Sequence, residues 1–181
     1  GLPRVVATSD QPDLRDALNE IGQRALSAVD TTLRRRLPMR DRIRAYANGW
    51  YASIADLGKL REAVGKVLEL GYTALKFDPF GAGGREMGRA DLRAACKAVE
   101  AVRDAVGPDV DIIIECHGRF SVGTSIEAIK AMQPYEPLFC EEPIPAHNMD
   151  SQAWVTRAAS AMGARVATGE HTYSRFGFQE L

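Results

Sequence analysis

The chain has 181 residues, of which 45% are hydrophobic and 26% charged, and its formal net charge is −1 at pH 7. This length is enough for one domain with a substantial hydrophobic core. A nearly neutral chain has no strong electrostatic attraction to nucleic acid or to an anionic membrane, so we expect neither as a partner. No apolar run reaches the roughly 20 residues of a membrane-spanning helix, and no signal peptide is recognised, so we expect a cytoplasmic protein.

The three cysteines, Cys96, Cys116 and Cys140, share no CxxC spacing, and two of them lie inside apolar runs. Disulfides are rare in the cytosol, where buried and reduced thiols are the usual state of cysteine. We therefore predict three free cysteines, buried in the fold rather than joined in a disulfide.

The first forty residues differ in pattern from the rest. Apolar residues recur with helical spacing over residues 13–37, and Pro38 ends the pattern. We predict that residues 1–38 form an N-terminal helical segment that packs outside the domain that follows, and that residues 39–181 form this domain.

From residue 43 onward, short apolar runs alternate with amphipathic stretches. The runs are bounded by turn residues and are apolar on both faces in their first half, which is typical of parallel strands covered on both sides. The predicted strands are 43–50, 73–80, 111–118, 138–144 and 165–171.

The stretches between these runs predict helices. Residues 56–71 and 91–107 each place apolar residues on one face and end at glycine. Thr124 with Glu127 has the spacing of a capping box at the start of a third helix, and Ser151 is the predicted cap of a fourth.

Alternating strands and helices indicate right-handed βαβ units and a parallel sheet, which either closes toward a barrel or stays open and doubly wound. An open dinucleotide-binding sheet would need GxGxxG after its first strand. The only glycine-rich loop, residues 80–88, follows the second run and has Glu86 in place of the third glycine. We expect this loop to be a mobile loop over a pocket rather than a nucleotide site.

Charged side chains gather at the C-terminal ends of the predicted strands, the end that carries the active site in parallel α/β folds and in (β/α)8 barrels especially. Three successive strands then bring a carboxylate to one rim, and an all-carboxylate ligand set suits Mg²⁺ better than Zn²⁺. The residues concerned are Lys76, Asp78, Glu115, His117, Glu141, Glu142, Glu170 and His171.

Each of these residues alone has an ordinary structural explanation, since a glutamate at a strand end usually caps a loop or forms a salt bridge. Three on successive strands at the same end favour a metal site. Strand alternation places His117 on the same face as Glu115, which makes His117 a candidate acid or base. His171 follows its glutamate directly and is a weaker candidate, and His147 is interpreted as a loop residue.

Four motifs, "KFDPFG" from Lys76, "ECHGRFS" from Glu115, "CEEPIP" from Cys140 and "ATGEHTYSRFGF" from Ala167, occur in this order at predicted strand ends. With these motifs the chain resembles the enolase superfamily in its mandelate racemase/muconate lactonizing enzyme-like subgroup, over roughly residues 25–181. It is most similar to the acid-sugar dehydratases that act on galactonate or gluconate. The resemblance implies a (β/α)8 TIM-barrel type of α/β fold, of which about five βα units are represented.

The resemblance also implies a ligand set. Glu115, Glu141 as the first acid of "EEP", and Glu170 of "GE" would bind Mg²⁺, although the first ligand is more often Asp in the family. Lys76 and Asp78 lie where many relatives have a Lys-x-Lys pair whose second lysine is the base in racemases. Asp78 at that position argues against a racemase or epimerase, which stays an alternative.

The implied reaction is Mg²⁺-dependent dehydration of an aldonate through an enediolate to a 2-keto-3-deoxy acid. His117 would give a proton to the departing 3-hydroxyl, and Lys76 would add positive charge beside the substrate. The expected partners are the small sugar-acid substrate and, as in many relatives, further copies of the chain in a homo-oligomer.

The sequence departs from the family pattern at both ends. It stops at Leu181, shortly after the third ligand, so no residue is assigned as the base that removes the α-proton. Residues 1–38 stand in the place of a linker from a capping domain that is not represented. We therefore expect a fragment of such an enzyme, and whether the chain itself is an enzyme stays open. The alternatives are a catalytically inactive module for metal binding or oligomerisation, and a regulatory sugar-acid binder.

Overall fold

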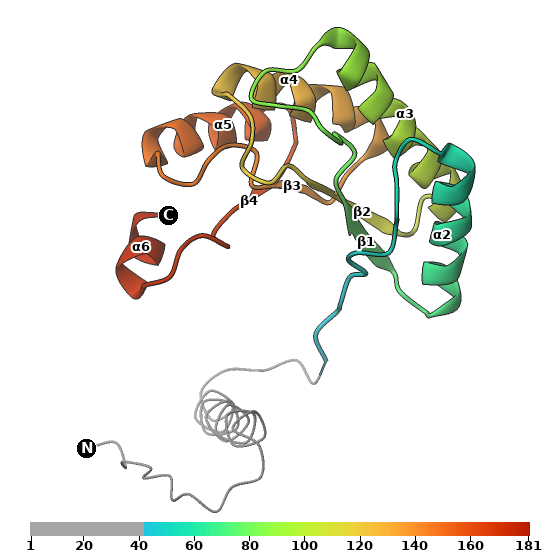
Figure 1. Ribbon diagram of the computed structural model, residues 1–181. Helices are drawn as coiled ribbons and strands as arrows, with labels where there is room; N and C mark the ends of the chain where they lie inside the picture. Colours follow the sequence, from blue (N-terminus) through green and yellow to red (C-terminus); the bar gives the residue numbers. More distant parts are fainter. Residues whose placement is uncertain (1–41) are drawn as a thin grey trace, which may run out of the picture. The chain divides into compact units, whose positions relative to one another are not determined.

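The computed structural model describes residues 42–181, so the predicted N-terminal helical segment 1–38 lies outside the described residues (Figure 1). The chain divides into two units, Gly1–Arg44 and Ala45–Leu181, and the second unit is the one described below. Within residues 42–181, none of the helices has the length and apolar character needed to cross a bilayer.

Helices and strands alternate through this unit, as the sequence pattern predicts. The helices and the 3-10 turn are α2 (Leu57–Glu69), α3 (Arg89–Val106), α4 (Val122–Met132), η1 (Gln133–Tyr135), α5 (Met149–Ala161) and α6 (Arg175–Glu180). The strands are β1 (Ala74–Phe77), β2 (Asp111–Glu115), β3 (Phe139–Glu141) and β4 (Val166–Ala167).

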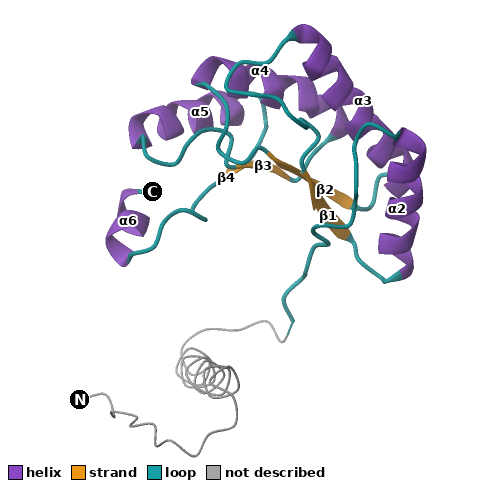
Figure 2. Ribbon diagram, viewed as in Figure 1, coloured by secondary structure: helices purple, strands orange, loops and turns teal. Residues whose placement is uncertain are grey.

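The four strands form one parallel sheet in the order β1-β2-β3-β4, so each strand pairs with its neighbours in the sequence. Helices α2 to α5 lie along one side of this sheet (Figures 1 and 2). A doubly wound sheet reverses its strand order and carries helices on both faces, whereas strand order in sequence with helices on one side is the arrangement of a barrel wall. The prediction of a barrel-type α/β fold is confirmed.

The prediction of a full strand over 43–50 is wrong. Only Ala47 pairs with the sheet, as an isolated parallel bridge to Leu75, and its N–H donates to the carbonyl of Ala74 at 2.9 Å. Gly49 has a φ of 65°, which is outside the range of an extended strand, so the pairing cannot continue toward Trp50.

Two predicted helix caps are also wrong. Helix α4 is capped by Ser121, whose Oγ accepts a hydrogen bond from the Thr124 N–H at 3.2 Å. Helix α5 is capped by Asn148, whose Oδ1 accepts from the Ser151 N–H at 2.9 Å. In both cases the residue predicted as the cap instead donates its own N–H to the observed cap. The prediction therefore placed the start of each helix three residues too late.

The two faces of the sheet have different contents. Leu75, Phe77, Ile112, Ile114 and Cys140 belong to the hydrophobic core. Strand side chains alternate between faces, so the residues between these positions point to the opposite face, and they include the charged side chains of the sheet.

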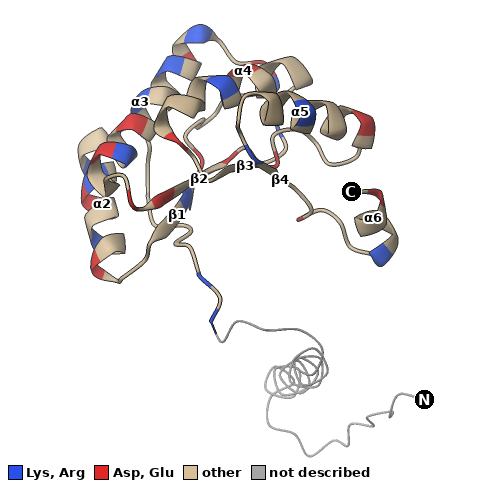
Figure 3. Ribbon diagram, turned by 180° about the vertical axis from the view of Figure 1, so that it is seen from behind, with Lys and Arg blue, Asp and Glu red and all other residues tan. Residues whose placement is uncertain are grey.

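The described cysteines are free, as predicted, with Cys116 and Cys140 buried and Cys96 half-buried. On the outer helices, Figure 3 shows acidic and basic residues interspersed along α2 to α5, in keeping with the nearly neutral net charge.

Candidate functional site

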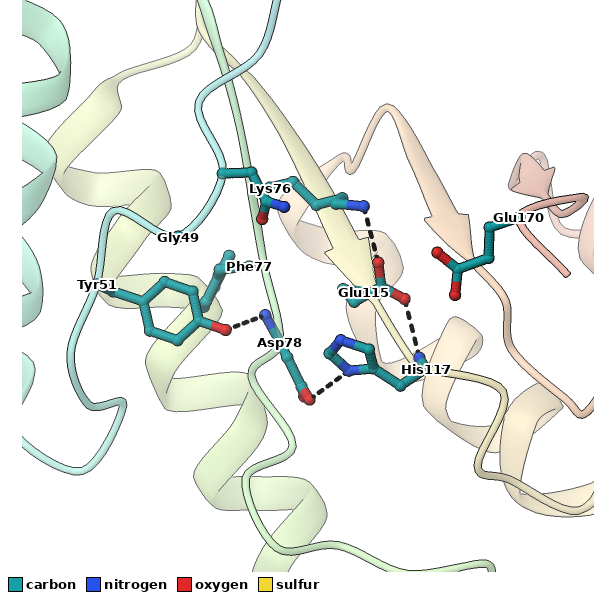
Figure 4. A pocket seen from close by; sticks show the side chains of 9 residues that line it. Gly49, Tyr51, Lys76, Phe77, Asp78, Glu115, His117 and Glu170 are labelled. Atoms are coloured by element: carbon teal, nitrogen blue, oxygen red, sulfur yellow. Dashed lines mark hydrogen bonds and ion pairs between the residues drawn. The ribbon is translucent and has the colours of Figure 1, made fainter. Parts of the chain in front are cut away.

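A cavity of about 350 Å³ opens at the C-terminal ends of β1 and β2 (Figure 4). Five of the six residues singled out from the sequence as catalytic or metal-binding line it, and Glu141 joins them through a contact with Lys76. The lining residues are Asn48, Gly49, Tyr51, Lys76, Phe77, Asp78, Glu115, His117 and Glu170.

Lys76 lies at the centre of the site, on the face of β1 opposite the core. Its Nζ is 2.9 Å from the Oε2 of Glu115 and 2.9 Å from the Oε2 of Glu141, and only 7% of its side chain is exposed. Burial by itself lowers the pKa of Lys76, but the hydrogen bonds and charges of the two glutamates outweigh burial and raise the pKa above its usual value. Lys76 is therefore a fixed cation held between two carboxylates.

Sheet register explains why these two carboxylates meet. Glu115 and Glu141 are direct partners in the pairing of β2 with β3, and Lys76 pairs with Ile113, two residues before Glu115. Paired residues on neighbouring strands have side chains on the same face about 5 Å apart. The Oε1 of Glu115 also accepts the backbone N–H of His117 at 2.9 Å, so both oxygens of Glu115 are bound.

The adjacent Glu142 has a different environment from Glu141. It is fully buried, with a φ of 44°, and its Oε1 accepts hydrogen bonds from the Thr168 hydroxyl at 2.9 Å and the Gly169 N–H at 2.7 Å. The Glu170 N–H donates to the same oxygen at 3.3 Å. Glu142 thus holds the loop after β4, and its Oε2 has no partner among residues 42–181.

Glu170 is the predicted ligand that stands apart. Its side chain lines the cavity, and Figure 4 shows it on the side of Glu115 away from Tyr51. Its Oε1 lies 3.3 Å from the Nε2 of His171, and both side chains are about half exposed. Within residues 42–181, no three Asp, Glu, His or Cys side chains lie close enough together to hold a metal ion as they stand.

Even so, the donors fit a hard cation in their chemistry. Glu115 and Glu141 already converge on one positive charge, the ammonium of Lys76, and Glu170 faces the same cavity. Carboxylate oxygens are the ligands that Mg²⁺ prefers in proteins. The two glutamates therefore bind the ammonium of Lys76, and Glu170 is a third carboxylate within the cavity.

His117 follows the end of β2 and has a φ of 52°, so strand alternation does not place it. Its Nδ1 lies 2.9 Å from the Oδ2 of Asp78, and Figure 4 shows its other ring nitrogen directed away from Asp78 toward the space beside Lys76. Asp78 and His117 are therefore a hydrogen-bonded pair, brought together from the ends of β1 and β2.

Sequence reasoning missed Arg119, which joins this pair. Its guanidinium forms an ion pair with the Oδ2 of Asp78, and its Nη1 donates to the carbonyls of Gly81 at 2.8 Å and Gly83 at 3.3 Å. An arginine two residues after a candidate catalytic histidine was the available signal, because a guanidinium readily pairs with a carboxylate on the next strand.

The glycine-rich loop 80–88 does not line this cavity, so the predicted position over a pocket is not found here. Besides Arg119, the loop is held at the start of α4. The Thr124 hydroxyl donates to Glu86 at 2.8 Å, and the Ser121 N–H donates to the Arg85 carbonyl at 3.0 Å. Hydrogen bonds from Thr124 and Ser121 lower the pKa of Glu86. The loop therefore connects the strand ends to α4.

Geometry alone defines a class: a barrel-type α/β domain with carboxylates, a buried lysine and an Asp–His pair at the C-terminal ends of its strands. Comparison with known proteins gives the family. The family model Enolase C-terminal domain-like matches residues 59–181, and the chain belongs to this family.

Sequence relatives include two proteins that are named as sugar-acid dehydratases. The chain is 46% identical over 136 residues to the D-gluconate dehydratase of Thermoproteus tenax, a match that covers 75% of this chain and 27% of the relative. It is 40% identical over 102 residues to the D-gluconate/D-galactonate dehydratase of Picrophilus torridus, covering 56% and 26% of the two chains. This chain therefore spans about a quarter of the length of these relatives.

Solved structures agree with this assignment. A mandelate racemase/muconate lactonizing enzyme from Jannaschia sp. CCS1 superposes with a TM-score of 0.70 at 33% identity, covering 78% of this chain and 39% of the other. A mandelate racemase/muconate lactonizing enzyme-like protein from Rubrobacter xylanophilus gives a TM-score of 0.67 at 33% identity, covering 79% and 41%. The resemblance inferred from the four sequence motifs is confirmed.

Proposed function

We propose that this chain carries part of the active site of a Mg²⁺-dependent acid-sugar dehydratase acting on an aldonate such as gluconate or galactonate. One observation carries the proposal: the buried Lys76–Glu115–Glu141 cluster and the Asp78–His117 pair meet at a single cavity. The dehydratase names of the gluconate and galactonate relatives support the choice of reaction.

The chemistry needed is loss of water across two neighbouring carbons. The C–H bond next to the carboxylate breaks, the C–O bond of the 3-hydroxyl breaks, and the resulting enol becomes a 2-keto-3-deoxy acid. Glu115, Glu141 and Glu170 would hold Mg²⁺, which supplies a Lewis acid that neutralises charge on the substrate carboxylate as the α-proton leaves. None of the roles proposed for residues 42–181 is that of the base for this proton.

Besides the proposed Mg²⁺ ligands, Lys76 and His117 have roles in this reaction: Lys76 supplies positive charge and His117 supplies a proton. Lys76 is a fixed positive charge in the cavity wall, and with Mg²⁺ offsetting the charges of Glu115 and Glu141 it would add positive charge beside the carboxylate of an aldonate. His117, when protonated at Nε2, can donate that proton to the departing 3-hydroxyl, so the hydroxyl leaves as water and the imidazole becomes neutral. Asp78 can keep its hydrogen bond to Nδ1 throughout this transfer.

A racemase or epimerase is disfavoured by the contacts of Asp78. Its Oδ1 accepts the Phe80 N–H at 2.8 Å, and its Oδ2 faces His117 and Arg119. A base that removes an α-proton needs a free lone pair directed at the substrate. Both oxygens of Asp78 are bound, so Asp78 is an anchor and not the counterpart of a racemase lysine.

The test is conversion of D-gluconate, D-galactonate and D-xylonate by this chain, with formation of 2-keto-3-deoxy acid measured colorimetrically in MgCl₂ and in EDTA. We expect Mg²⁺ binding that is sharply weaker in Glu141→Gln than in Glu142→Gln, and any turnover should require Mg²⁺ and be lost in His117→Gln. Mg²⁺ binding without turnover on any aldonate would favour the inactive metal-binding module. Equal effects of the two glutamate variants would show that the ligand is assigned wrongly.

We also propose that the chain assembles with further copies of itself. The C-terminal region exposes aromatic side chains, with Tyr173 86% exposed, Phe176 63% and Phe178 57%. Light scattering after size-exclusion chromatography would give the mass directly, and a monomer at micromolar concentration contradicts this proposal.

A further inference from the structure

We propose that Arg119 is a positioning residue that fixes Asp78 and, through Asp78, holds His117 with its proton on Nδ1 and its Nε2 directed into the cavity. The inference about the tautomer stands on the contacts of these three residues. Its catalytic consequence rests on the proposed dehydratase function.

The carboxylate of Asp78 is held at both ends. Its Oδ1 accepts the Phe80 N–H at 2.8 Å, and its Oδ2 is shared by His117 and Arg119. Only 11% of the Asp78 side chain is exposed. Because donors reach it from both sides, this carboxylate cannot rotate away from His117 without losing hydrogen bonds at both oxygens.

The surroundings of Nδ1 decide the tautomer. Nδ1 lies 2.9 Å from Oδ2 of Asp78 and 3.0 Å from Nη2 of Arg119. An ionised carboxylate can only accept, and a guanidinium can only donate. With a proton on Nδ1, Oδ2 accepts from both His117 and Arg119, and all three groups are compatible.

The rival tautomer has a bare Nδ1 that accepts from Arg119. The lone pair of Nδ1 would then face a negatively charged oxygen at 2.9 Å with no proton between them, which is repulsive. Asp78 carries the negative charge that attracts the Nδ1 proton, whereas the guanidinium of Arg119 is positively charged. The protonated Nδ1 is therefore favoured, and Nε2 is the nitrogen left for the cavity.

Arg119 is well placed to act as the fixed part of this arrangement. Its Nε donates to the carbonyl of Cys116 at 3.0 Å, and its Nη1 donates to two carbonyls in the glycine-rich loop. Only 18% of its side chain is exposed. The planar guanidinium makes these contacts in fixed directions, which the single ammonium of a lysine cannot reproduce.

The same contacts give the glycine-rich loop a role. The Gly81 and Gly83 carbonyls hold one edge of the guanidinium while Asp78 binds the other. Gly81 has a φ of 58°, a left-handed conformation that favours glycine and turns its carbonyl within reach of Arg119. The loop thus holds Arg119 through these two carbonyls, although it does not line the cavity.

The experiment is ¹⁵N NMR of the full chain with ¹⁵N-labelled histidine, at alkaline pH where neutral tautomers are distinguished by the shifts of Nδ1 and Nε2. The chain has three histidines, and the His117 signals are assigned by their loss in His117→Gln. We expect the Nδ1-protonated form of His117 to exceed the other by at least about tenfold, as a hydrogen bond to a charged group implies. A majority of the Nε2-protonated form in the unaltered chain overturns the inference without any variant.

Variants then separate Arg119 from Asp78. Arg119→Met removes both the donor that holds Asp78 beside Nδ1 and the donor available to the rival tautomer; we expect the loss of Asp78 positioning to dominate and the tautomer ratio to fall several-fold. Arg119→Lys should reduce the ratio less, and the exposed Arg93→Met serves as the matched control with no change. Circular dichroism and thermal unfolding establish that each variant is folded. An unchanged ratio in a folded Arg119→Met overturns the positioning role.

The catalytic consequence is read separately. With turnover established, Arg119→Lys should lower kcat about tenfold or more while KM changes little, because the proton donor is misaligned and not removed. If the unaltered chain shows the expected tautomer but no turnover, the proposed function fails and the positioning role of Arg119 stands. A KM effect with unchanged kcat would overturn the catalytic consequence.

Discussion

Replacing Lys76 by methionine tests whether the strand-end glutamates form a cation site. Methionine keeps a similar length and apolar stem but removes the ammonium that lies 2.9 Å from both Glu115 and Glu141. Their side chains are only 6% and 16% exposed, so water screens their charges poorly. The variant therefore leaves two neighbouring carboxylates without a counter-charge.

The expected cost follows from burial. Removing one partner of a buried ion pair typically costs about 3–5 kcal/mol, because the remaining charge has lost its compensation. For a domain of this size, 1 kcal/mol shifts Tm by roughly 2–4 °C, so Lys76→Met should unfold roughly 6–20 °C lower. Mg²⁺ can replace the lost charge, and at about 100 times its Kd a ligand returns about 2.7 kcal/mol.

The assay is thermal unfolding of both chains over a series of MgCl₂ concentrations at constant ionic strength. Mg²⁺ should raise the Tm of Lys76→Met more than that of the unaltered chain, in which it competes with an ammonium. Lys59→Met is the matched control, because 80% of the Lys59 side chain is exposed and its solvent-screened pair with Asp56 adds little to stability. Equal Mg²⁺ shifts in the two chains, or a loss below about 1 kcal/mol in Lys76→Met, would refute the reasoning.

Three further predictions concern the groups around the site. Glu142→Ala should destabilise the domain by about 2–4 kcal/mol in urea unfolding, since three donors in the loop after β4 lose their buried acceptor, while Glu142→Gln keeps an oxygen there and should cost less. Ser121→Ala should cost about 1 kcal/mol through loss of the α4 cap, and an unchanged midpoint would contradict this. Burial raises the pKa of Cys116 and raises that of Cys140 to about 12. A thiol reagent at pH 8 should therefore reach only Cys96 before unfolding, and stability should fall as pH rises above about 9, where unfolded thiols ionise and native ones do not.

Much of the fold could be predicted because its signals are local. Strands β1 and β2 lie in sequence runs that are apolar on both faces. Such runs are typical of parallel strands, and nearly every residue of β1 and β2 is buried in the structure. The run 43–50 failed because a strand requires pairing partners as well as apolar residues, and Gly49 turns the chain after one bridge. The alternation of strands and helices alone could not decide between a barrel wall and a doubly wound sheet, since strand order depends on contacts between distant segments, and the resemblance carried by the four motifs supplied the barrel.

The candidate site was predicted in part for the same reason. The rule that parallel strands carry functional groups at their C-terminal ends located Lys76 and Glu115 without knowledge of the fold. The contacts of Arg119 and Glu142 were not predicted, because their partners Asp78 and Thr168 lie 41 and 26 residues away. No periodicity in a sequence reports a hydrogen bond between two loops.

Sheet register explains why Glu115 and Glu141 need a positive charge beside them. Glu115 and Glu141 are direct neighbours in a parallel ladder, and like charges in directly opposed positions destabilise a sheet. A chain that places two carboxylates there must also supply positive charge, and this chain does so with Lys76 on the adjacent strand. Lys76 reaches the pair from one side and Glu170 faces the cavity beyond them, so any function assigned to this site has to account for a buried ammonium between two carboxylates and a third carboxylate in the same cavity.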